Sequence, residues 1–244
     1  MAKQLSEKGH AFRKLVRENL RLVLAAVAAC IFIWLLEEVG EGELTKLDAA
    51  AYQLFVQNLR QPWLTPYMES ISELAQPVAL LVMLLAVEAF APGRRPGACA
   101  AVNLVCAVAL NVLLKQLVQR PRPDGFRLIA ETGYSFPSGH SMVAMAFYGL
   151  LLWMVWRYER DRLVKWACSA GFALVIVLIG VSRVYLGVHY ASDVLAGFCV
   201  SAVWLSVYTT VVAPVMLSID DVSAWKGKAV PEKPGAPAGR HFNK

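Results

Sequence analysis

Two histidines in this 244-residue chain have neighbours that would suit nucleophilic and acid–base chemistry. His189 precedes Asp193 by four residues, a spacing that puts the two side chains in contact on one helix face. A carboxylate there keeps one imidazole nitrogen protonated and leaves the other free as a nucleophile or base. His140 follows Ser138-Gly139, where a polar loop becomes a long apolar run, and could give a proton to a departing oxygen. The pair is suited to covalent catalysis.

The segment around His140 also has the residues of a helix start. Pro137 disfavours helix in the residue before it, and Ser138 is a good N-cap. Gly139 places no side chain between the backbone and a bound group. The free N–H groups and the positive end of the helix dipole would then form a seat for phosphate. Taken alone, this stretch fits equally well a capped helix that carries a surface histidine.

Three fixed cations are expected near the histidines, namely Lys115, Arg122 and Arg183. Such a cluster is unfavourable unless an anion fills it, and phosphate accepts paired arginine hydrogen bonds well. Each feature also has an ordinary explanation. Lys115 could extend to the membrane interface, Arg122 could belong to a stiff Arg-Pro-Arg-Pro loop, and the His189–Asp193 pair could be a structural hydrogen bond. Together, the residues favour phosphoryl transfer without a metal.

The elements that must position these residues are membrane spans. The chain is 57% hydrophobic and 17% charged, with a mean hydropathy of +0.49, which is typical of a polytopic membrane protein. The five cysteines lie in apolar runs and form no CxxC pair, so neither a disulfide framework nor a zinc site is expected. We therefore predict an all-α bundle of six transmembrane helices, at about residues 22–39, 71–91, 98–118, 138–156, 165–182 and 190–213.

A longer connection, residues 40–70, separates the first two spans. Its apolar residues recur at helical spacing between Leu44 and Leu59, which predicts a short amphipathic helix in the membrane interface. This segment could form part of a headgroup entrance or could brace the bundle. The remaining divisions are a basic cytoplasmic N-terminal segment (1–21), the membrane domain (22–217) and a disordered cytoplasmic tail (218–244).

The orientation follows from the distribution of positive charge. Of the 24 lysine and arginine residues, 17 lie on the side of the two termini and 7 on the other side, so both termini are predicted to be cytoplasmic. The connections that carry His140 and His189 are separated by two spans and therefore emerge on the same, outer face. Arg120 and Arg127 flank these residues without a fixed spacing, and we take them as headgroup contacts.

At this point the sequence resembles the type-2 phosphatidic acid phosphatases, also called lipid phosphate phosphatases. The family pattern is Lys-x6-Arg-Pro, then Pro-Ser-Gly-His, then Ser-Arg-x5-His-x3-Asp. Every position is met, by Lys115, Arg122-Pro123, Pro137-Ser138-Gly139-His140, Ser182-Arg183, His189 and Asp193. The pattern spans residues 115–193, and the six-span layout extends the resemblance across the membrane domain.

The resemblance implies roles for these residues. His189 would attack phosphorus, Asp193 would orient it, and His140 would protonate the leaving group and later activate water. The phosphate would be held by Lys115, Arg122, Ser138, Gly139 and Arg183. The family uses no metal or other cofactor. Among its members, the chain resembles bacterial enzymes that act on undecaprenyl diphosphate or phosphatidylglycerol phosphate, and phosphatidic acid is a third candidate.

The expected protein is thus a metal-independent lipid phosphatase of a bacterial inner membrane, with its site on the extracytoplasmic side. Its partners would be a lipid phosphate and the bilayer, with no nucleic acid and no obligate protein partner. Two alternatives remain. A phosphotransferase would use the same residues and differ only in its acceptor. A non-catalytic lipid binder or transporter would also have six spans, but no inverted repeat is visible.

Overall fold

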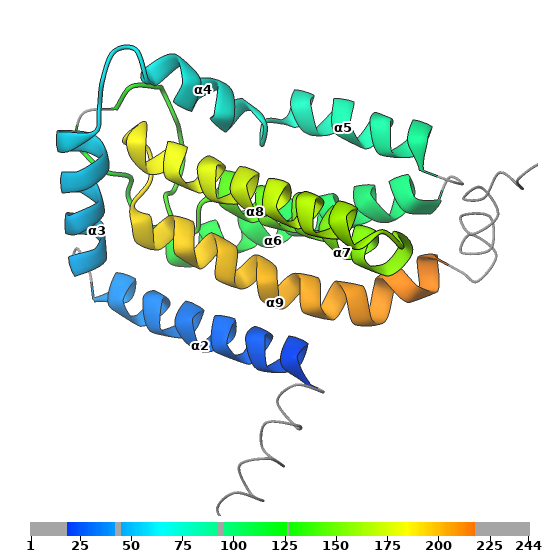
Figure 1. Ribbon diagram of the computed structural model, residues 1–244. Coiled ribbons are helices and arrows are strands. Elements are labelled where there is room, and N and C mark those ends of the chain that lie inside the picture. Colours follow the sequence, from blue (N-terminus) through cyan, green and yellow to red (C-terminus); the bar gives the residue numbers. More distant parts are fainter. Residues whose placement is uncertain (1–18, 42–44, 92–94, 126, 218–244) are drawn as a thin grey trace, which may run out of the picture.

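The regular elements of the protein are helices throughout the residues that its computed structural model describes, which are 19–41, 45–91, 95–125 and 127–217 (Figure 1). The expected N-terminal segment lies almost wholly outside these ranges, and the expected tail lies outside them entirely. In order, the elements are α2 (Leu20–Gly40), α3 (Lys46–Ala51), the π-helix η1 (Tyr52–Asn58), α4 (Thr65–Glu73), α5 (Pro77–Phe90), α6 (Arg95–Val118), α7 (Gly139–Tyr158), α8 (Arg162–Tyr185) and α9 (Ala191–Met216).

Five of these helices, α2, α6, α7, α8 and α9, are long and apolar enough to cross a membrane. Their bounds agree with the predicted spans to within a few residues. Many of their large apolar side chains face outward, as expected for helices surrounded by lipid rather than water. The prediction of an all-helical, multi-pass membrane protein is confirmed.

The second predicted span differs from a single helix. It consists of α4 and α5, which are bent by 52° at a break of three residues, Leu74–Gln76. Pro77 opens α5, where its missing N–H costs nothing because the first helical turn has no partner for it. The proline therefore starts a new helix instead of kinking a continuous one. As a result α4 packs on α8, whereas α5 packs on α6.

The core of the bundle is formed by α7, which packs against α6, α8 and α9, while α2 covers the other side of α9. Phe147, Leu150 and Ile179 are fully buried there. Gly197 on α9 allows a close approach to the backbone at the start of α7, because a Cβ at this position would lie 2.9 Å from the carbonyl oxygen of Ser138. The beginnings of α7 and α9 are thereby held side by side.

The predicted interfacial helix is present as α3 followed directly by η1. Thr45 caps α3, its side chain accepting a hydrogen bond from the N–H of Asp48 at 3.0 Å. α3 stands across one end of the bundle, where the 119–138 loop and the turn between α8 and α9 also lie (Figure 1). The polar residues of the sequence pattern gather at this same end.

Candidate functional site

His189 lies in the turn between α8 and α9, two residues before the first residue of α9. We expected it on the helix, so this detail is corrected, but the contact with Asp193 is present: Nδ1 lies 3.4 Å from Oδ2. Asp193 occupies the third helical position and accepts the N–H of Tyr190 at 2.8 Å, as an N-terminal cap. His189 and Asp193 are both buried. The cap thus fixes the carboxylate beside the imidazole.

The other imidazole nitrogen faces Arg122. Nη1 of Arg122 is 3.2 Å from Nε2 of His189 and 3.0 Å from the carbonyl oxygen of Val188. A guanidinium group only donates, so Nε2 must be the acceptor and the proton of the neutral ring must be on Nδ1, toward Asp193. Burial, reinforced by Arg183 and Arg122, lowers the pKa of His189 to about 4 despite the opposing effect of Asp193. His189 is therefore neutral near pH 7, with the Nε2 lone pair directed into the site.

Arg183, near the end of α8, is fully buried. Its Nη1 donates to Ser72 Oγ on α4 at 2.6 Å, and its Nη2 makes a short ion pair with Glu131. Glu131 also lies 3.5 Å from Nη2 of Arg122. Burial alone would raise the pKa of Glu131, but Arg183 and Arg122 hold this pKa below its usual value. A carboxylate of the protein thus bridges two cations that the sequence assigned to phosphate.

The start of α7 is built as predicted. Ser138 is the N-cap, and its hydroxyl oxygen accepts from the N–H and the hydroxyl of Ser141. The N–H of Ser138 donates to the carbonyl oxygen of Asp193 at 3.0 Å, which ties the start of α7 to the start of α9. His140 is in the first turn, and its Nε2 is buried without a hydrogen-bond partner among the described residues. The Nε of Arg183 is likewise buried without a hydrogen-bond partner among the described residues.

Two residues of the predicted phosphate seat complete this region. Lys115 is half-buried in the last turn of α6 and interacts electrostatically with Arg122, Arg183, Glu131 and Asp193. One turn before it, Asn111 donates to the carbonyl oxygen of Pro137 at 3.1 Å, and a Cβ on Gly139 would meet Asn111 Oδ1 at 3.1 Å. The end of α6 therefore lies directly against the Pro-Ser-Gly-His segment. All eight predicted site residues are brought to one end of the bundle.

The assignment of Arg120 to headgroup binding does not fit the structure. Arg120 is buried and donates from Nη1 to Asp193 Oδ1 at 2.7 Å and from Nη2 to Asp48 Oδ2 at 3.0 Å. The sequence analysis also missed Ser135, which donates a short hydrogen bond to Asp193. A signal for Asp48 was present, since it is a charged residue three positions before Ala51 on the apolar face of its helix. Asp48 and Asp193 are 72 and 73 residues away from Arg120 in sequence, so residue spacing alone could not reveal these two contacts.

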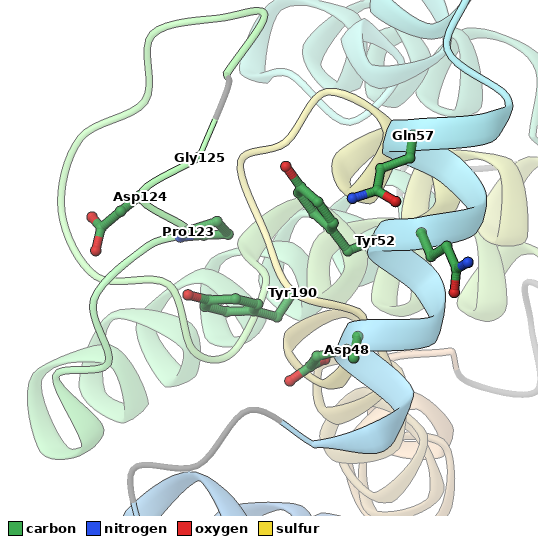
Figure 2. Close-up of a pocket in the computed structure, with 9 residues that line it drawn as sticks. Asp48, Tyr52, Gln57, Pro123, Asp124, Gly125 and Tyr190 are labelled. Carbon is green, nitrogen blue, oxygen red and sulfur yellow. The ribbon is translucent and has the colours of Figure 1, made fainter.

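A cavity of about 570 Å³ lies beside this centre, between α3–η1 and the loop at Pro123–Gly125 (Figure 2). Tyr52 and Gln57 line it from the helical segment, and Tyr190 lines it from the turn that carries His189. None of the three predicted phosphate-binding cations lines it. The cavity is therefore adjacent to the site, because Pro123 and Tyr190 directly follow Arg122 and His189 in the chain.

The comparison with protein families decides the identity of the fold. Residues 96–216 match the model of the PAP2 superfamily. Phosphatidylglycerophosphatase B of Bacillus subtilis is 35% identical over 148 residues, which cover 57% of this chain and 71% of that protein. The chain belongs to the PAP2 superfamily. The matched region begins in α6 and ends in α9, so it includes every element that carries a predicted site residue.

Two further PAP2 relatives agree with this result. An undecaprenyl-diphosphatase of Sulfolobus acidocaldarius is 30% identical over 136 residues, covering 53% of this chain and 59% of that one. The crystal structure of a transmembrane PAP2-type phosphatidylglycerolphosphate phosphatase from Bacillus subtilis superimposes with a TM-score of 0.66 at 29% identity, covering 75% of this chain and 93% of that one. This PAP2 protein is accordingly a membrane lipid phosphatase, that is, a phosphate-monoester hydrolase.

Proposed function

We propose that this protein removes the terminal phosphate of a membrane lipid phosphate or diphosphate through a phosphohistidine on His189, without a metal. The observation that carries the proposal is the arrangement of three buried nitrogen atoms. Nε2 of His189 has its lone pair directed into the site, and Nε2 of His140 and Nε of Arg183 are buried without protein partners among the described residues. A phosphate oxygen or a leaving-group oxygen would pair the two unpaired atoms.

The reaction then balances in two steps. In the first, Arg122 turns from Nε2 of His189 to the phosphate and frees the lone pair. Nε2 then forms a bond to phosphorus while the bond from phosphorus to the lipid oxygen breaks, and His140 gives its proton to that oxygen. Asp193 accepts the Nδ1–H hydrogen bond and offsets the positive charge that develops on the ring. In the second, His140 takes a proton from water, the water oxygen attacks phosphorus, and inorganic phosphate leaves His189.

The phosphate oxygens would be held by Lys115, Arg122 and Arg183, with Ser138 and the N–H of Gly139 at the start of α7. Fixed positive charges and helix-terminal N–H groups stabilise the negative charge that is spread over a transferring phosphoryl group. Glu131 occupies part of this arrangement by pairing with Arg183 and Arg122. The incoming phosphate would take over these two cations.

The favoured substrates are undecaprenyl diphosphate and phosphatidylglycerol phosphate, with phosphatidic acid as a third candidate. Relatives named for the first two activities support this choice. We place the protein in a bacterial inner membrane with both termini in the cytoplasm, on the distribution of lysine and arginine. The site then faces outward at the bilayer boundary, where a headgroup can enter while its apolar chain stays in lipid.

The decisive experiment is rapid-quench analysis of the detergent-purified protein with lipids labelled in the terminal phosphate, in the presence of EDTA. We expect inorganic phosphate to be released and a transient label on the protein that is stable in alkali and labile in acid, as a phosphoramidate is. Loss of release in EDTA would contradict the metal-free reaction. Transfer of the label to an added acceptor lipid instead of water would favour the phosphotransferase.

The role of His140 as a proton donor makes a prediction about leaving groups. For His140→Asn, we expect kcat with a lipid phosphate to fall about 10²- to 10⁴-fold, because an alkoxide leaves poorly without a proton. With p-nitrophenyl phosphate, whose leaving group needs no proton, the first step should be much less impaired, and burst kinetics should show phosphoenzyme accumulating. An equal loss of the first step for both substrates would contradict the assignment.

The neutral state of His189 makes a prediction about pH. Its pKa is lowered to about 4, so the neutral ring should persist above pH 4 and be lost as the pH falls through that value. The measurement is an NMR titration of the imidazole in the ligand-free protein, assigned by comparison with His189→Gln. It is preferable to a rate profile, because a lipid phosphate has its own ionisation at about pH 6. A midpoint near pH 6.5 would show that burial and the two arginines do not lower the pKa of His189.

A further inference from the structure

Four buried polar side chains outside the sequence pattern form a hydrogen-bonded group around Asp193. They are Asp48 of α3, Arg120, Ser135 and Ser192. Arg120 is the centre of this group: Nη1 donates to Asp193 Oδ1 and to Ser192 Oγ, both at 2.7 Å, and Nη2 donates to Asp48 Oδ2 at 3.0 Å. The guanidinium carbon also lies 4.1 Å from the centre of the Tyr190 ring, so the group is fixed in its plane as well as at its ends.

The two oxygens of Asp193 have different surroundings. Oδ2 faces His189 Nδ1 and also accepts from Ser135 and from the N–H of Tyr190. On Oδ1, the charged donor is Arg120. The final torsion of an aspartate is soft, so the orientation of the carboxylate depends on what holds each oxygen. Arg120 therefore fixes the rotation that keeps Oδ2 directed at the imidazole.

Asp48 holds Arg120 in turn. Its Oδ1 accepts the N–H of Ser192 at 2.8 Å and its Oδ2 accepts the hydroxyl of Ser192 at 2.8 Å, in addition to the bond from Arg120. Asp48 is 3% exposed, and Arg120 is 9% exposed. One guanidinium thus lies between two buried carboxylates and gives one Nη to each. This two-sided arrangement needs the planar fork of arginine, which lysine lacks.

A brace for α3 alone would not require a bond to Asp193. The bundle could hold α3 through the Asp48–Ser192 bonds and the apolar contacts of Ala51 and Phe55 with Val184 and Val194. Burying two carboxylates and a guanidinium is costly, and such groups add little to stability compared with apolar packing. Stability alone therefore does not account for the bond from Arg120 to Asp193. This charge-assisted hydrogen bond sets the position of a group next to the attacking histidine.

We propose that Arg120, anchored by Asp48 of α3, is a positioning residue that acts through Asp193 to keep His189 in the tautomer and orientation needed for attack on phosphorus. The inference rests on the proposed phosphohistidine mechanism. It makes the segment before the second span part of the catalytic apparatus, although α3 contributes no group that touches the phosphate. Figure 2 shows Asp48 on this segment, and both Asp48 and Tyr190 line the cavity.

The first test separates chemistry from binding. For Arg120→Met we expect kcat to fall about 10- to 100-fold, the usual cost of losing an outer hydrogen bond to a reacting group, with KM within about twofold. Arg120→Lys should recover only part of the loss, and Asp48→Asn should cause a smaller loss of kcat. Matched controls are Glu37→Gln, an exposed carboxylate on α2 that does not line the cavity, and Arg157→Met at the other end of α7. An unchanged kcat in Arg120→Met, or an increase in KM alone, would overturn the proposal.

The second test asks whether Arg120 acts through Asp193. In the Asp193→Asn background, adding Arg120→Met should lower kcat by less than about twofold, because the group that Arg120 positions is already altered. The matched cycle combines Arg120→Met with His140→Asn. It should give nearly additive losses, because His140 is proposed to act in proton transfer and not through Asp193. Additive losses in the Asp193 cycle would mean that Arg120 acts elsewhere, and the proposal would fail.

The third test does not depend on turnover, so it distinguishes this proposal from the proposed function. The Nδ1–H proton of His189, hydrogen-bonded to a carboxylate, should give a far-downfield NMR resonance that is absent from His189→Gln. We expect this resonance in the wild type and in the Glu37→Gln control, and its loss or a large upfield shift in Arg120→Met. An unchanged resonance in Arg120→Met would overturn the positioning role, whereas absence of phosphate release by the wild type would overturn the proposed function instead.

Discussion

Replacing His189 with glutamine is expected to lower kcat for phosphate release by at least about a thousandfold. Removing the nucleophile of a covalent mechanism leaves only the binding and charge stabilisation that the rest of the site supplies. No label should appear on the protein in the rapid-quench experiment. The binding of inorganic phosphate should persist, because Lys115, Arg122 and Arg183 are untouched.

This variant should remain folded. Leu186 and Val188, which flank His189, are fully buried, and Arg122 keeps its hydrogen bond to the Val188 carbonyl oxygen when the ring is removed. An unchanged elution volume and a similar midpoint of thermal unfolding in detergent would verify this. The comparison with His140→Asn is informative, because that variant should still form the phosphoenzyme from p-nitrophenyl phosphate. A His189→Gln protein that keeps a tenth or more of the activity would refute the nucleophile assignment.

Arg183→Met is expected to lower kcat/KM about 10²- to 10³-fold, which is typical of losing one donor that stabilises charge in a transition state. Arg183 is fully buried, so its charge acts without screening by bulk water. Its fork is held by Ser72 and Glu131, while Nε remains available for a phosphate oxygen. Steady-state kinetics with a lipid phosphate in mixed micelles would measure the loss.

Two further variants show whether the loss arises from the position of the charge. Arg183→Lys keeps the positive charge but cannot reach Ser72 and Glu131 at once, so it should recover only a small part of the activity. Ser72→Ala removes one anchor and leaves the fork intact, and we expect a loss of about tenfold or less. Full activity in Arg183→Lys would mean that charge alone suffices, which would contradict the arrangement described here.

The sequence was sufficient for the fold because hydropathy and the family pattern are local signals. Each apolar run is long enough to span a membrane by itself, and the pattern from Lys115 to Asp193 is read along one chain. Counting spans was also enough to place His140 and His189 on the same face. The bend between α4 and α5 was not predictable in the same way. A proline in an apolar run can kink a helix or start a new one, and only the packing of α4 on α8 and of α5 on α6 decides which.

The parts of the candidate site that the sequence did not predict are contacts between distant segments. Glu131 was not singled out, because nothing near it in sequence indicates a partner such as Arg183, 52 residues away. Arg120 was misassigned for a related reason. An arginine beside a cationic motif is expected to bind an anion from outside, but here two carboxylates of the chain itself satisfy it. The roles of the eight predicted site residues remain predictions until the variants are measured.

The close packing of α9 on α7 has a consequence for divergence within the family. His189 and His140, the proposed nucleophile and proton donor, lie at the starts of two helices that are joined by the Ser138–Asp193 backbone bond, and Gly197 leaves room for only a hydrogen at their crossing. The packing of the two helices thus determines the spacing of the two histidines. Cavity-lining residues such as Tyr52 and Gln57 belong to other segments. We expect substitutions in those segments to leave the distance between the two histidines unchanged. In engineering a new specificity, Gly197 is the residue to leave alone.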